Sequence, residues 1–251
     1  MTMQTQDSQA PLLAVVVPVK NEADNILPLV SEIDAALNGK VPFEIVYVDD
    51  GSDDATPRML TDTQAKFPML RVVRHRNSCG QSQAVATGVK AARAAVIATL
   101  DGDGQNDPAD IPAMLDRLLA EPEDKRDFLL VAGHRQKRQD DGIRLISSKI
   151  ANNIRAGLLK DDTPDTGCGL KVFTRAAFLD MPRFNHMHRF LPALMIRRGG
   201  KVVSVRVNHR PRERGVSKYG VWNRLWVGIV DLFGVMWLQA RASVPVIDRQ
   251  D

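Results

Sequence analysis

The sequence predicts an α/β fold in which a mostly parallel sheet is flanked by helices. Two observations carry this prediction, and a third bears on the compartment. Short apolar runs alternate with helical patterns over the first hundred residues, which is typical of parallel strands joined by right-handed crossovers. The chain has 251 residues, 44% of them hydrophobic and 25% charged, enough for one large core of ordinary composition. Its two cysteines, Cys79 and Cys168, cannot form a disulfide framework, which favours a reducing compartment.

The elements are expected in a regular order along the chain. They are a strand at 12–17 stopped by Pro18, a helix at 23–37, a strand at 43–48, a helix at about 54–66 with Thr56 and Pro57 near its start, a strand at 70–73, a helix at 81–93, a strand at 96–100 and a later strand at 201–207. Residues 1–11 are polar without an apolar stretch, so we expect a frayed tail and no signal peptide there. The main domain is expected over 12–220.

Polar side chains follow each of the first four predicted strands. They are Asn21 and Glu22, Asp49 and Asp50, Arg76 and Asn77, and Asp101 and Asp103. Ligands of parallel sheets bind beyond the carboxyl ends of the strands, so these clusters should share one edge of one sheet. The sequence therefore predicts a single site there.

The turn from Asp101 to Asp103 is the most specific of these clusters. Two carboxylates one residue apart, loosened by Gly102, can both face a hard cation such as Mg²⁺ or Mn²⁺ that also binds substrate phosphate. The sequence contains no G-x-x-x-x-G-K-[ST] loop, and no G-x-G-x-x-G follows the first strand. An ATPase and a Rossmann dehydrogenase are therefore disfavoured.

Three segments in this order resemble the inverting GT-A glycosyltransferases of family 2. They are VPVKNE at 17–22, VDDGSDDAT at 48–56 and DGDGQ at 101–105. Within that family, four later segments look most like the polyprenyl-phosphate glycosyltransferases, the dolichol-phosphate mannosyltransferase group. These are GHR at 133–135, RLISS at 144–148, DTGCGLK at 165–171 and RERGVSKY at 212–219. The resemblance extends from about residue 13 to residue 219.

The resemblance implies a donor half of the site. The residues that would bind the nucleotide sugar are Pro18, Val19, Asn21, Glu22, Asp49 at the base, Asp50 near the ribose and diphosphate, Gly80, Asp101 and Gly102. Asp101, Asp103 and Gln105 would hold Mg²⁺ or Mn²⁺, with Asp103 as the surest ligand. Gly80 fits a simple helix start equally well, and the residues after Asp50 fit a turn in which Asp53 or Asp54 caps the next helix.

The resemblance also implies an acceptor half that binds a lipid phosphate. Its residues would be Arg135, Arg144, Ser148, Arg212, Ser217 and Lys218, the last three on a loop that closes over both phosphates. The forked donors of arginine suit phosphate oxygens, and Arg144 and Ser148 would share one helix face. Asp165 would orient the acceptor or act as a base, so the expected catalytic set is Asp103, Asp165, Arg135 and Arg144.

Two residues depart from the family pattern, and the histidines carry little signal. Cys168 stands where serine is usual and Lys171 where arginine is usual. We expect Cys168 to be a small buried residue beneath the site. His186, His188 and His209 are not spaced as a metal site, so surface or packing roles are expected for them.

The net charge of +4 is unevenly distributed, and the chain ends in an amphipathic stretch. Basic residues dominate from 183 to 224, which suggests a surface that meets anionic phosphate or membrane. The apolar part of 221–251, residues 225–238, is shorter than the roughly 20 residues of a spanning helix and carries tryptophans and edge arginines. It fits either a helix in the lipid headgroup region or one packed on the domain.

These observations lead to one functional expectation and two alternatives. We expect a peripheral enzyme at the cytoplasmic face of a membrane that moves a sugar from a UDP- or GDP-sugar to a polyprenyl phosphate with inversion, for cell-envelope glycan or lipid modification. A small membrane protein is a further potential partner, and no nucleic acid is expected. The alternatives are a family 2 transferase acting on a hydroxyl of a glycolipid or polysaccharide, and a non-catalytic nucleotide-binding adaptor.

Overall fold

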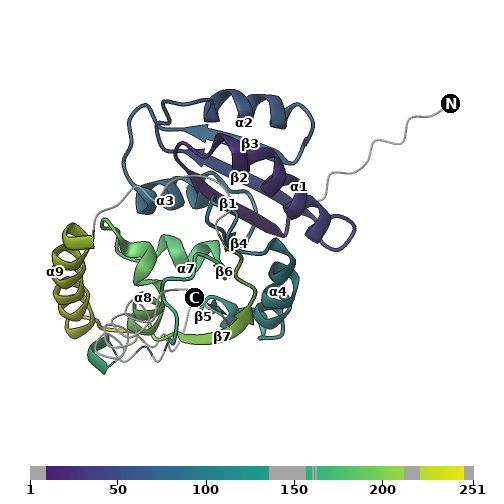
Figure 1. Ribbon diagram of the computed structural model, residues 1–251. Coiled ribbons are helices and arrows are strands. Elements are labelled where there is room, and N and C mark those ends of the chain that lie inside the picture. Colours follow the sequence, from purple (N-terminus) through teal and green to yellow (C-terminus); the bar gives the residue numbers. More distant parts are fainter. Residues whose placement is uncertain (1–9, 136–156, 160, 162, 212–220, 246–251) are drawn as a thin grey trace.

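A computed structural model describes residues 10–135, 157–159, 161, 163–211 and 221–245, and the backbone alone over 221–227. Seven strands form one sheet in the order β3-β2-β1-β4-β6-β5-β7 (Figure 1). Their bounds are β1 Leu13–Val19, β2 Phe43–Asp49, β3 Leu70–Arg74, β4 Val96–Thr99, β5 Leu129–Arg135, β6 Lys171–Thr174 and β7 Lys201–Val207. Neighbouring strands are parallel except at β6, which is antiparallel to both β4 and β5.

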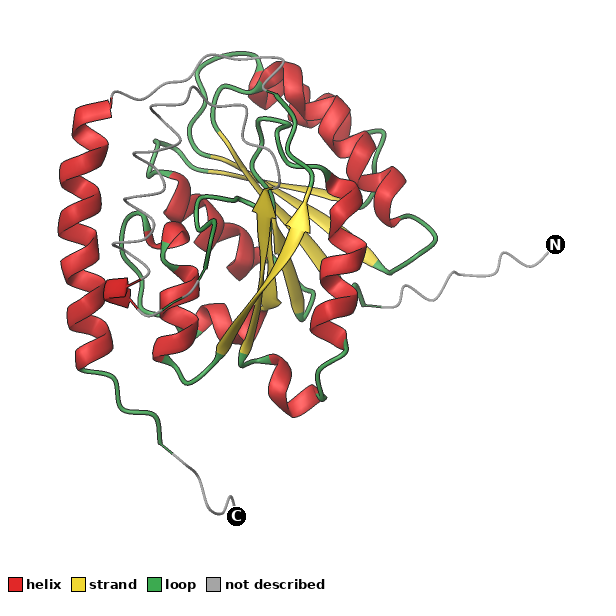
Figure 2. Cartoon of the chain, turned by 60° about the horizontal axis from the view of Figure 1, so that its bottom comes forward, coloured by secondary structure: helices red, strands yellow, loops and turns green. Residues whose placement is uncertain are grey.

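Helices cover both faces of the sheet (Figures 1 and 2). Those described are η1 Ala23–Asn25, α1 Ile26–Leu37, α2 Thr56–Gln64, α3 Gln81–Ala91, η2 Pro108–Asp110, α4 Ile111–Leu119, α5 Glu123–Arg126, α7 Arg175–Leu179, η3 Met187–Arg189, α8 Leu191–Arg197 and α9 Val221–Ala240. α1, α2 and α4 contribute to the core on one face, and α3, α7, α8 and α9 to the core on the other. Because the central strands β1 and β4 are covered on both faces, they are apolar almost throughout.

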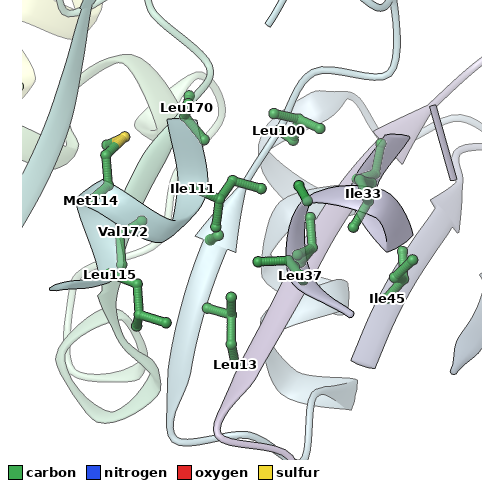
Figure 3. Packing of buried hydrophobic residues seen from close by; sticks show 14 of the residues in the cluster. Leu13, Ile33, Leu37, Ile45, Leu100, Ile111, Met114, Leu115, Leu170 and Val172 are labelled. Carbon is green, nitrogen blue, oxygen red and sulfur yellow. The ribbon is translucent and has the colours of Figure 1, made fainter. Parts of the chain in front are cut away.

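The core under α1 and α4 shows how the strand side chains divide between the faces (Figure 3). Leu13 of β1 points into this core with Ile33 of α1 and Ile111 of α4, and all three are fully buried. Ala14 and Val16, the alternate residues of β1, belong to the opposite core. The central strand is thereby fixed on both sides, and its carboxyl end is a rigid platform for the loops that follow.

The predicted alternation of strands and helices is confirmed, with one correction at Pro18. β1 does not stop there but continues to Val19, paired with β2. The carbonyl of Val16 accepts from Leu100 N at 3.1 Å, so the backbone of Val16, and of Pro18 two residues on, faces β4. Pairing with β4 ends at Val16, so the missing N–H of Pro18 breaks no ladder bond.

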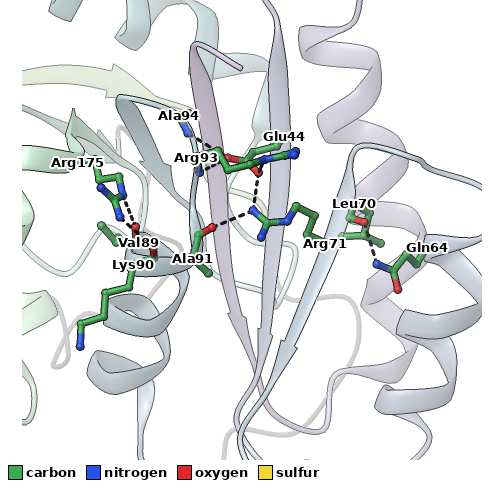
Figure 4. Close-up of polar contacts among 10 residues, drawn as sticks. All are labelled: Glu44, Gln64, Leu70, Arg71, Val89, Lys90, Ala91, Arg93, Ala94 and Arg175. Carbon is green, nitrogen blue, oxygen red and sulfur yellow. Dashed lines mark hydrogen bonds and ion pairs between the residues drawn. The ribbon is translucent and has the colours of Figure 1, made fainter. Parts of the chain in front are cut away.

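A buried carboxylate joins three segments at the amino end of the sheet (Figure 4). Glu44 of β2 accepts from Arg71 Nη1 at 2.9 Å, from the backbone N of Arg93 at 2.6 Å and from that of Ala94 at 3.1 Å. Arg71 also donates to the carbonyl of Ala91. Burial alone would raise the pKa of Glu44, but these hydrogen bonds outweigh it and lower the pKa. This network stabilises the end of the sheet opposite the polar clusters.

α9 lies at the periphery of the molecule in both ribbon views (Figures 1 and 2). Val235 is buried against the domain, and Leu232 and Met236 pack with it. Phe233 and Trp237 are 64% and 61% exposed and lie one turn apart. Among the described helices, none combines the length and apolar character needed to cross a membrane.

Candidate active site

Reciprocal hydrogen bonds join the loop after β1 to the loop after β2. Asn21 has a left-handed backbone (φ 53°) and donates its N–H to Ser52 Oγ at 2.9 Å. Its side chain donates to Asp53 Oδ1 at 2.6 Å and accepts from Asp53 N at 3.1 Å. Asp54, and not Asp53, accepts from the N–H of Thr56 at the start of α2. The ends of β1 and β2 therefore form one unit, to which Glu22 adds a bond to Thr56 Oγ1.

The two aspartates at the end of β2 are held differently. Asp49 is fully buried, accepts from Ser52 N at 2.9 Å and lies 3.1 Å from Arg74 Nε in an ion pair. Asp50 accepts four hydrogen bonds, and its donors are His75 Nδ1, Ser78 Oγ, Cys79 N and Gly80 N, at 2.7–2.8 Å. Burial would raise the pKa of Asp50, and these bonds lower it. Asp50 thus shapes the loop that leads into α3, and its contact with a nucleotide stays a prediction.

The loop before α3 packs closely against the end of β2. Gly51 (φ 68°) lies so close to it that an added Cβ would be 2.7 Å from Ser78 N. Gly80 adopts φ 88° and is the N-cap of α3, so the helix-start interpretation is confirmed. Asp50, His75 and Cys79 also place three potential ligand atoms within 4.8 Å of one another. Asp50 and His75 use those atoms in hydrogen bonds, including His75 Nε2 to Thr87 Oγ1 at 2.9 Å.

The aspartate pair of the sequence motif lies directly after β4. Asp101 is partly buried and accepts from Gln81 Nε2 at 2.8 Å. Burial and the neighbouring Asp103 raise the pKa of Asp101 to about 6. A divalent cation between two such carboxylates would relieve their repulsion, so the donor set fits Mg²⁺ or Mn²⁺.

Two glycines bring backbone close to this turn. A Cβ on Gly102 would lie 2.4 Å from Val19 Cγ1. The lack of a side chain at Gly102 therefore lets the turn pack directly against the end of β1. A Cβ on Gly169 would lie 2.2 Å from Asp101 Oδ2, so the carboxylate rests on the backbone of Gly169. Sequence reasoning missed Gly169, because its distance of 68 residues from Asp101 along the chain gives no signal.

Gln105, the predicted third metal ligand, lies in a short antiparallel backbone pairing with the segment that follows β7. Gln105 N donates to Asp103 Oδ1 at 3.2 Å, and Gln105 O accepts from Arg210 N at 2.9 Å. Asn106 and His209 form an antiparallel bridge beside it. Arg210 then pairs with Glu32 of α1 and with Asp107, each at 2.7 Å. The aspartate turn is thereby tied to the chain just before residues 212–220.

Arg135 and Asp165 form a bidentate pair at the end of β5. Arg135 Nε lies 2.6 Å from Asp165 Oδ2, and Nη2 lies 2.7 Å from Oδ1. Both side chains are mostly buried, at 12% and 7% exposed. Burial would lower the pKa of Arg135, and the Asp165 carboxylate raises it. The guanidinium carries five N–H groups, so this fork leaves donors for a second anion.

The segment after Asp165 fills the space beneath the site. Cys168 is 1% exposed, burial raises the pKa of its thiol, and Asn106 Nδ2 lies 3.8 Å from its sulfur. The expectation of a small buried residue is confirmed. Lys171, also buried, donates from Nζ to the carbonyls of Thr166 and Cys168, and burial lowers its pKa.

A cavity of about 150 Å³ opens beside Asp101. Polar side chains that line it include Gln81, Asp101, Lys171, His188 and Arg189. His188 and Arg189 are functional candidates that the sequence analysis missed, since their spacing matched no motif. A second hollow of about 160 Å³ lies next to Asp103 and is lined by Glu32 and Arg210.

Five predicted acceptor residues lie outside the described part of the chain: Arg144, Ser148, Arg212, Ser217 and Lys218. Their roles stay predictions.

A mostly parallel sheet with an aspartate pair at its carboxyl edge is the GT-A fold of glycosyltransferases. Solved structures agree with this class. Glucosyl-3-phosphoglycerate synthase from Mycobacterium tuberculosis, in complex with Mg²⁺ and UDP, superposes with a TM-score of 0.67 at 16% identity, over 94% of this chain and 81% of that one. A mannosyltransferase from Pyrobaculum calidifontis, in complex with GDP-mannose and Mn²⁺, gives 0.65 at 19% identity, over 95% and 66%.

The sequence comparisons define the family. The model described as glycosyl transferase family 2 matches residues 14–181. A dodecaprenyl-phosphate galacturonate synthase from Rhizobium johnstonii is 35% identical over 238 residues, 93% of this chain and 69% of the relative. An undecaprenyl-phosphate 4-deoxy-4-formamido-L-arabinose transferase from Pseudomonas fluorescens is 33% identical over 210 residues, 82% of this chain and 60% of the relative. The chain belongs to glycosyl transferase family 2.

Proposed function

We propose that this glycosyltransferase moves a sugar from a nucleoside diphosphate donor to a polyprenyl phosphate, with inversion at the anomeric carbon. The observation that carries the proposal is the presence of an aspartate pair and a buried arginine at one edge of one sheet. The relatives named above act on dodecaprenyl and undecaprenyl phosphates, which supports the same acceptor class here. Because the chain spans 60–69% of the length of these two relatives, its activity is inferred only for the part it shares with them.

On the donor side, Asp101, Asp103 and Gln105 would hold Mg²⁺ or Mn²⁺. When bound, the cation would supply positive charge next to the diphosphate leaving group. The chain's own contribution is to hold the two carboxylates close together: Gly169 supports Asp101, and Gln105 N hydrogen-bonds Asp103. The raised pKa of Asp101 supports this role, since a carboxylate that is both buried and close to Asp103 gains from a cation.

On the acceptor side, Arg135 would bind the lipid phosphate, with Asp165 fixing the plane of its guanidinium. An oxygen of that phosphate attacks the anomeric carbon as the bond to the diphosphate breaks. A phosphate monoester is already anionic at neutral pH, so no general base has to remove a proton. Asp165 is therefore assigned to orientation. Its pairing with Arg135 at 2.6 and 2.7 Å supports this assignment over one as a free base.

For the sugar itself, we favour a hexuronate. The cavity beside Asp101 is lined by Arg189 as well as by the carboxylate of Asp101 that would bind metal. A guanidinium suits a sugar carboxylate, because its N–H groups match the two carboxylate oxygens. The galacturonate synthase from Rhizobium johnstonii is consistent with this sugar class. The formamido-arabinose of the other relatives is the competing candidate, and it lacks that charge.

For the location, we infer that the enzyme binds the membrane surface from one side through α9. Its acceptor is a membrane lipid, and the exposed side chains of Phe233, Trp237 and Val230 form an apolar stripe on this helix. Aromatic side chains on such a stripe suit the headgroup region. The cytoplasmic face of the membrane follows from the nucleotide donor.

Purified protein tests this function with a panel of UDP- and GDP-sugars, Mn²⁺ and a polyprenyl phosphate in vesicles. We expect a lipid-linked sugar by mass spectrometry, with a UDP-hexuronate as the best donor. Asp103→Ala should abolish the product while leaving the circular dichroism spectrum unchanged. Turnover on a hydroxyl acceptor without any lipid-phosphate product would support the alternative family 2 activity and overturn the proposal.

A further inference from the structure

A short turn brings one histidine to the wall of the cavity beside Asp101. His186 takes a left-handed backbone (φ 66°), which directs the chain into η3. Met187 anchors the turn in the core at 1% exposed, and the next residue, His188, lines the cavity. His186 faces elsewhere and pairs with Asp231 of α9 at 3.0 Å. The two histidines of this turn thus lie in different environments, His186 against α9 and His188 at the cavity.

Ser82, the second residue of α3, holds the ring of His188. Ser82 Oγ accepts from His188 N at 3.2 Å and lies 2.7 Å from His188 Nδ1. A hydroxyl has one proton, and Nδ1 is the acceptor that the described residues offer to this buried serine. Nδ1 therefore accepts, and the ring proton is on Nε2. The described residues give Nε2 no hydrogen-bond partner.

The ring is neutral at physiological pH. Burial, followed by the nearby charges of Arg189, Lys171 and His186, lowers the pKa of His188 to about 3. A neutral imidazole with its tautomer fixed by Ser82 is a hydrogen-bond donor at Nε2. It is not a cation, and it cannot accept a proton from a substrate while Nε2 is protonated.

The position of the cavity identifies what this donor would meet. Asp101 lines it, and in the proposed function Asp101 would hold the metal that accompanies the diphosphate. The group that extends from the diphosphate into this space is the sugar. We propose that His188 donates a hydrogen bond from Nε2 to an oxygen of the donor sugar and helps to select that sugar, with Ser82 as the positioning residue. This inference rests on the proposed function for the identity of the donor.

The test compares His188→Leu with His188→Gln, because the glutamine amide carries an N–H close to the place of Nε2–H. We expect His188→Leu to raise the dissociation constant of the UDP-sugar roughly 10- to 100-fold, the range for a lost hydrogen bond to a neutral or charged oxygen. Binding of UDP alone should stay within about twofold, and His188→Gln should recover part of the loss. His186→Gln, on the same turn but facing α9, is the matched control and should behave as wild type.

Ser82→Ala and ¹⁵N NMR test the tautomer directly. Wild-type His188 should show the Nε2–H pattern unchanged from pH 5 to 8, and Ser82→Ala should show a mixture of tautomers with an intermediate loss of UDP-sugar affinity. An Nδ1–H pattern, or equal losses of UDP and UDP-sugar binding in His188→Leu, would overturn the inference. Donor binding is measured without lipid acceptor. A wild-type protein that binds UDP-sugar but makes no lipid-linked sugar therefore refutes the proposed function and leaves this test valid.

Discussion

Replacing Gly169 with alanine should weaken metal binding without unfolding the protein. The added Cβ would lie 2.2 Å from Asp101 Oδ2, 2.3 Å from Cγ and 2.6 Å from Oδ1. Ordinary contact begins near 3.4 Å, so the carboxylate has to move by about 1.2 Å. The backbone of Gly169 does not have a positive φ, so alanine brings no backbone strain of its own.

That displacement acts on the end of a side chain that is proposed to bind metal. It also removes the 2.8 Å hydrogen bond from Gln81 to Asp101. Loss of a group that orients a metal ligand typically costs 10- to 100-fold in metal affinity, and misplacement by 1 Å at a reacting centre costs a similar factor in rate. We therefore expect the Mn²⁺ dissociation constant to rise by roughly 10- to 100-fold.

Calorimetric titration of Mn²⁺ in the presence of UDP measures this effect, with thermal unfolding as a check on the fold. Gly234→Ala is the matched control, since a Cβ at this position of α9 meets nothing within 4 Å. That variant should bind Mn²⁺ as wild type does and unfold at an equal or slightly higher temperature. Unchanged Mn²⁺ affinity in Gly169→Ala would refute the link between Gly169 and the metal site.

Three further changes test other parts of the structure. Arg135→Met removes the guanidinium that pairs with the buried Asp165 carboxylate, so the free energy of unfolding should fall by about 3 kcal/mol and Tm by roughly 5–10 °C, together with loss of transfer. Glu44→Gln should cost about 2 kcal/mol at pH 7. Because the pKa of Glu44 is lowered from 4.5 in the folded state, its contribution is present above that value and is lost as pH falls through the folded pKa. In this variant the free energy of unfolding should therefore fall less steeply as the pH is lowered. Phe233→Ser with Trp237→Ser should reduce binding to anionic vesicles at least tenfold, measured by sedimentation, without changing UDP binding.

Each of these variants has an outcome that contradicts its reasoning. Arg135→Met with wild-type Tm would mean that the fork with Asp165 contributes little to stability. If the free energy of unfolding of Glu44→Gln falls with decreasing pH as steeply as that of wild type, other carboxylates cause the acid sensitivity. If the α9 double variant still binds vesicles and keeps its stability and activity, another surface contacts the membrane. Ala240→Ser, on the exposed surface near the end of the same helix, is the control for that pair.

Sequence reasoning predicted the fold of the first hundred residues well because its signals are local. Each strand of this part is a short apolar run bounded by turn residues, and each helix carries apolar residues at helical spacing. β5 and β6 were not predicted. β6 is four residues long, and its antiparallel pairing with β4 joins segments more than seventy residues apart. Pro18 was misread as a strand end because its neighbours across the sheet are not visible in the sequence.

The sequence by itself determined which chemistry is present and at which edge of the sheet it gathers. Strand alternation places the carboxyl ends together: the aspartate turn and Asn21 follow such ends, and Asp49 is the last residue of β2. Only the tertiary structure decided which side chains meet. It paired Arg135 with Asp165, set the Asp101 carboxylate on Gly169, and turned His188 into the cavity while His186 faces α9. The physical reason is that strand and helix periods act within a few residues. Contacts between residues far apart in the chain depend instead on how whole elements pack, which the spacing of motifs does not encode.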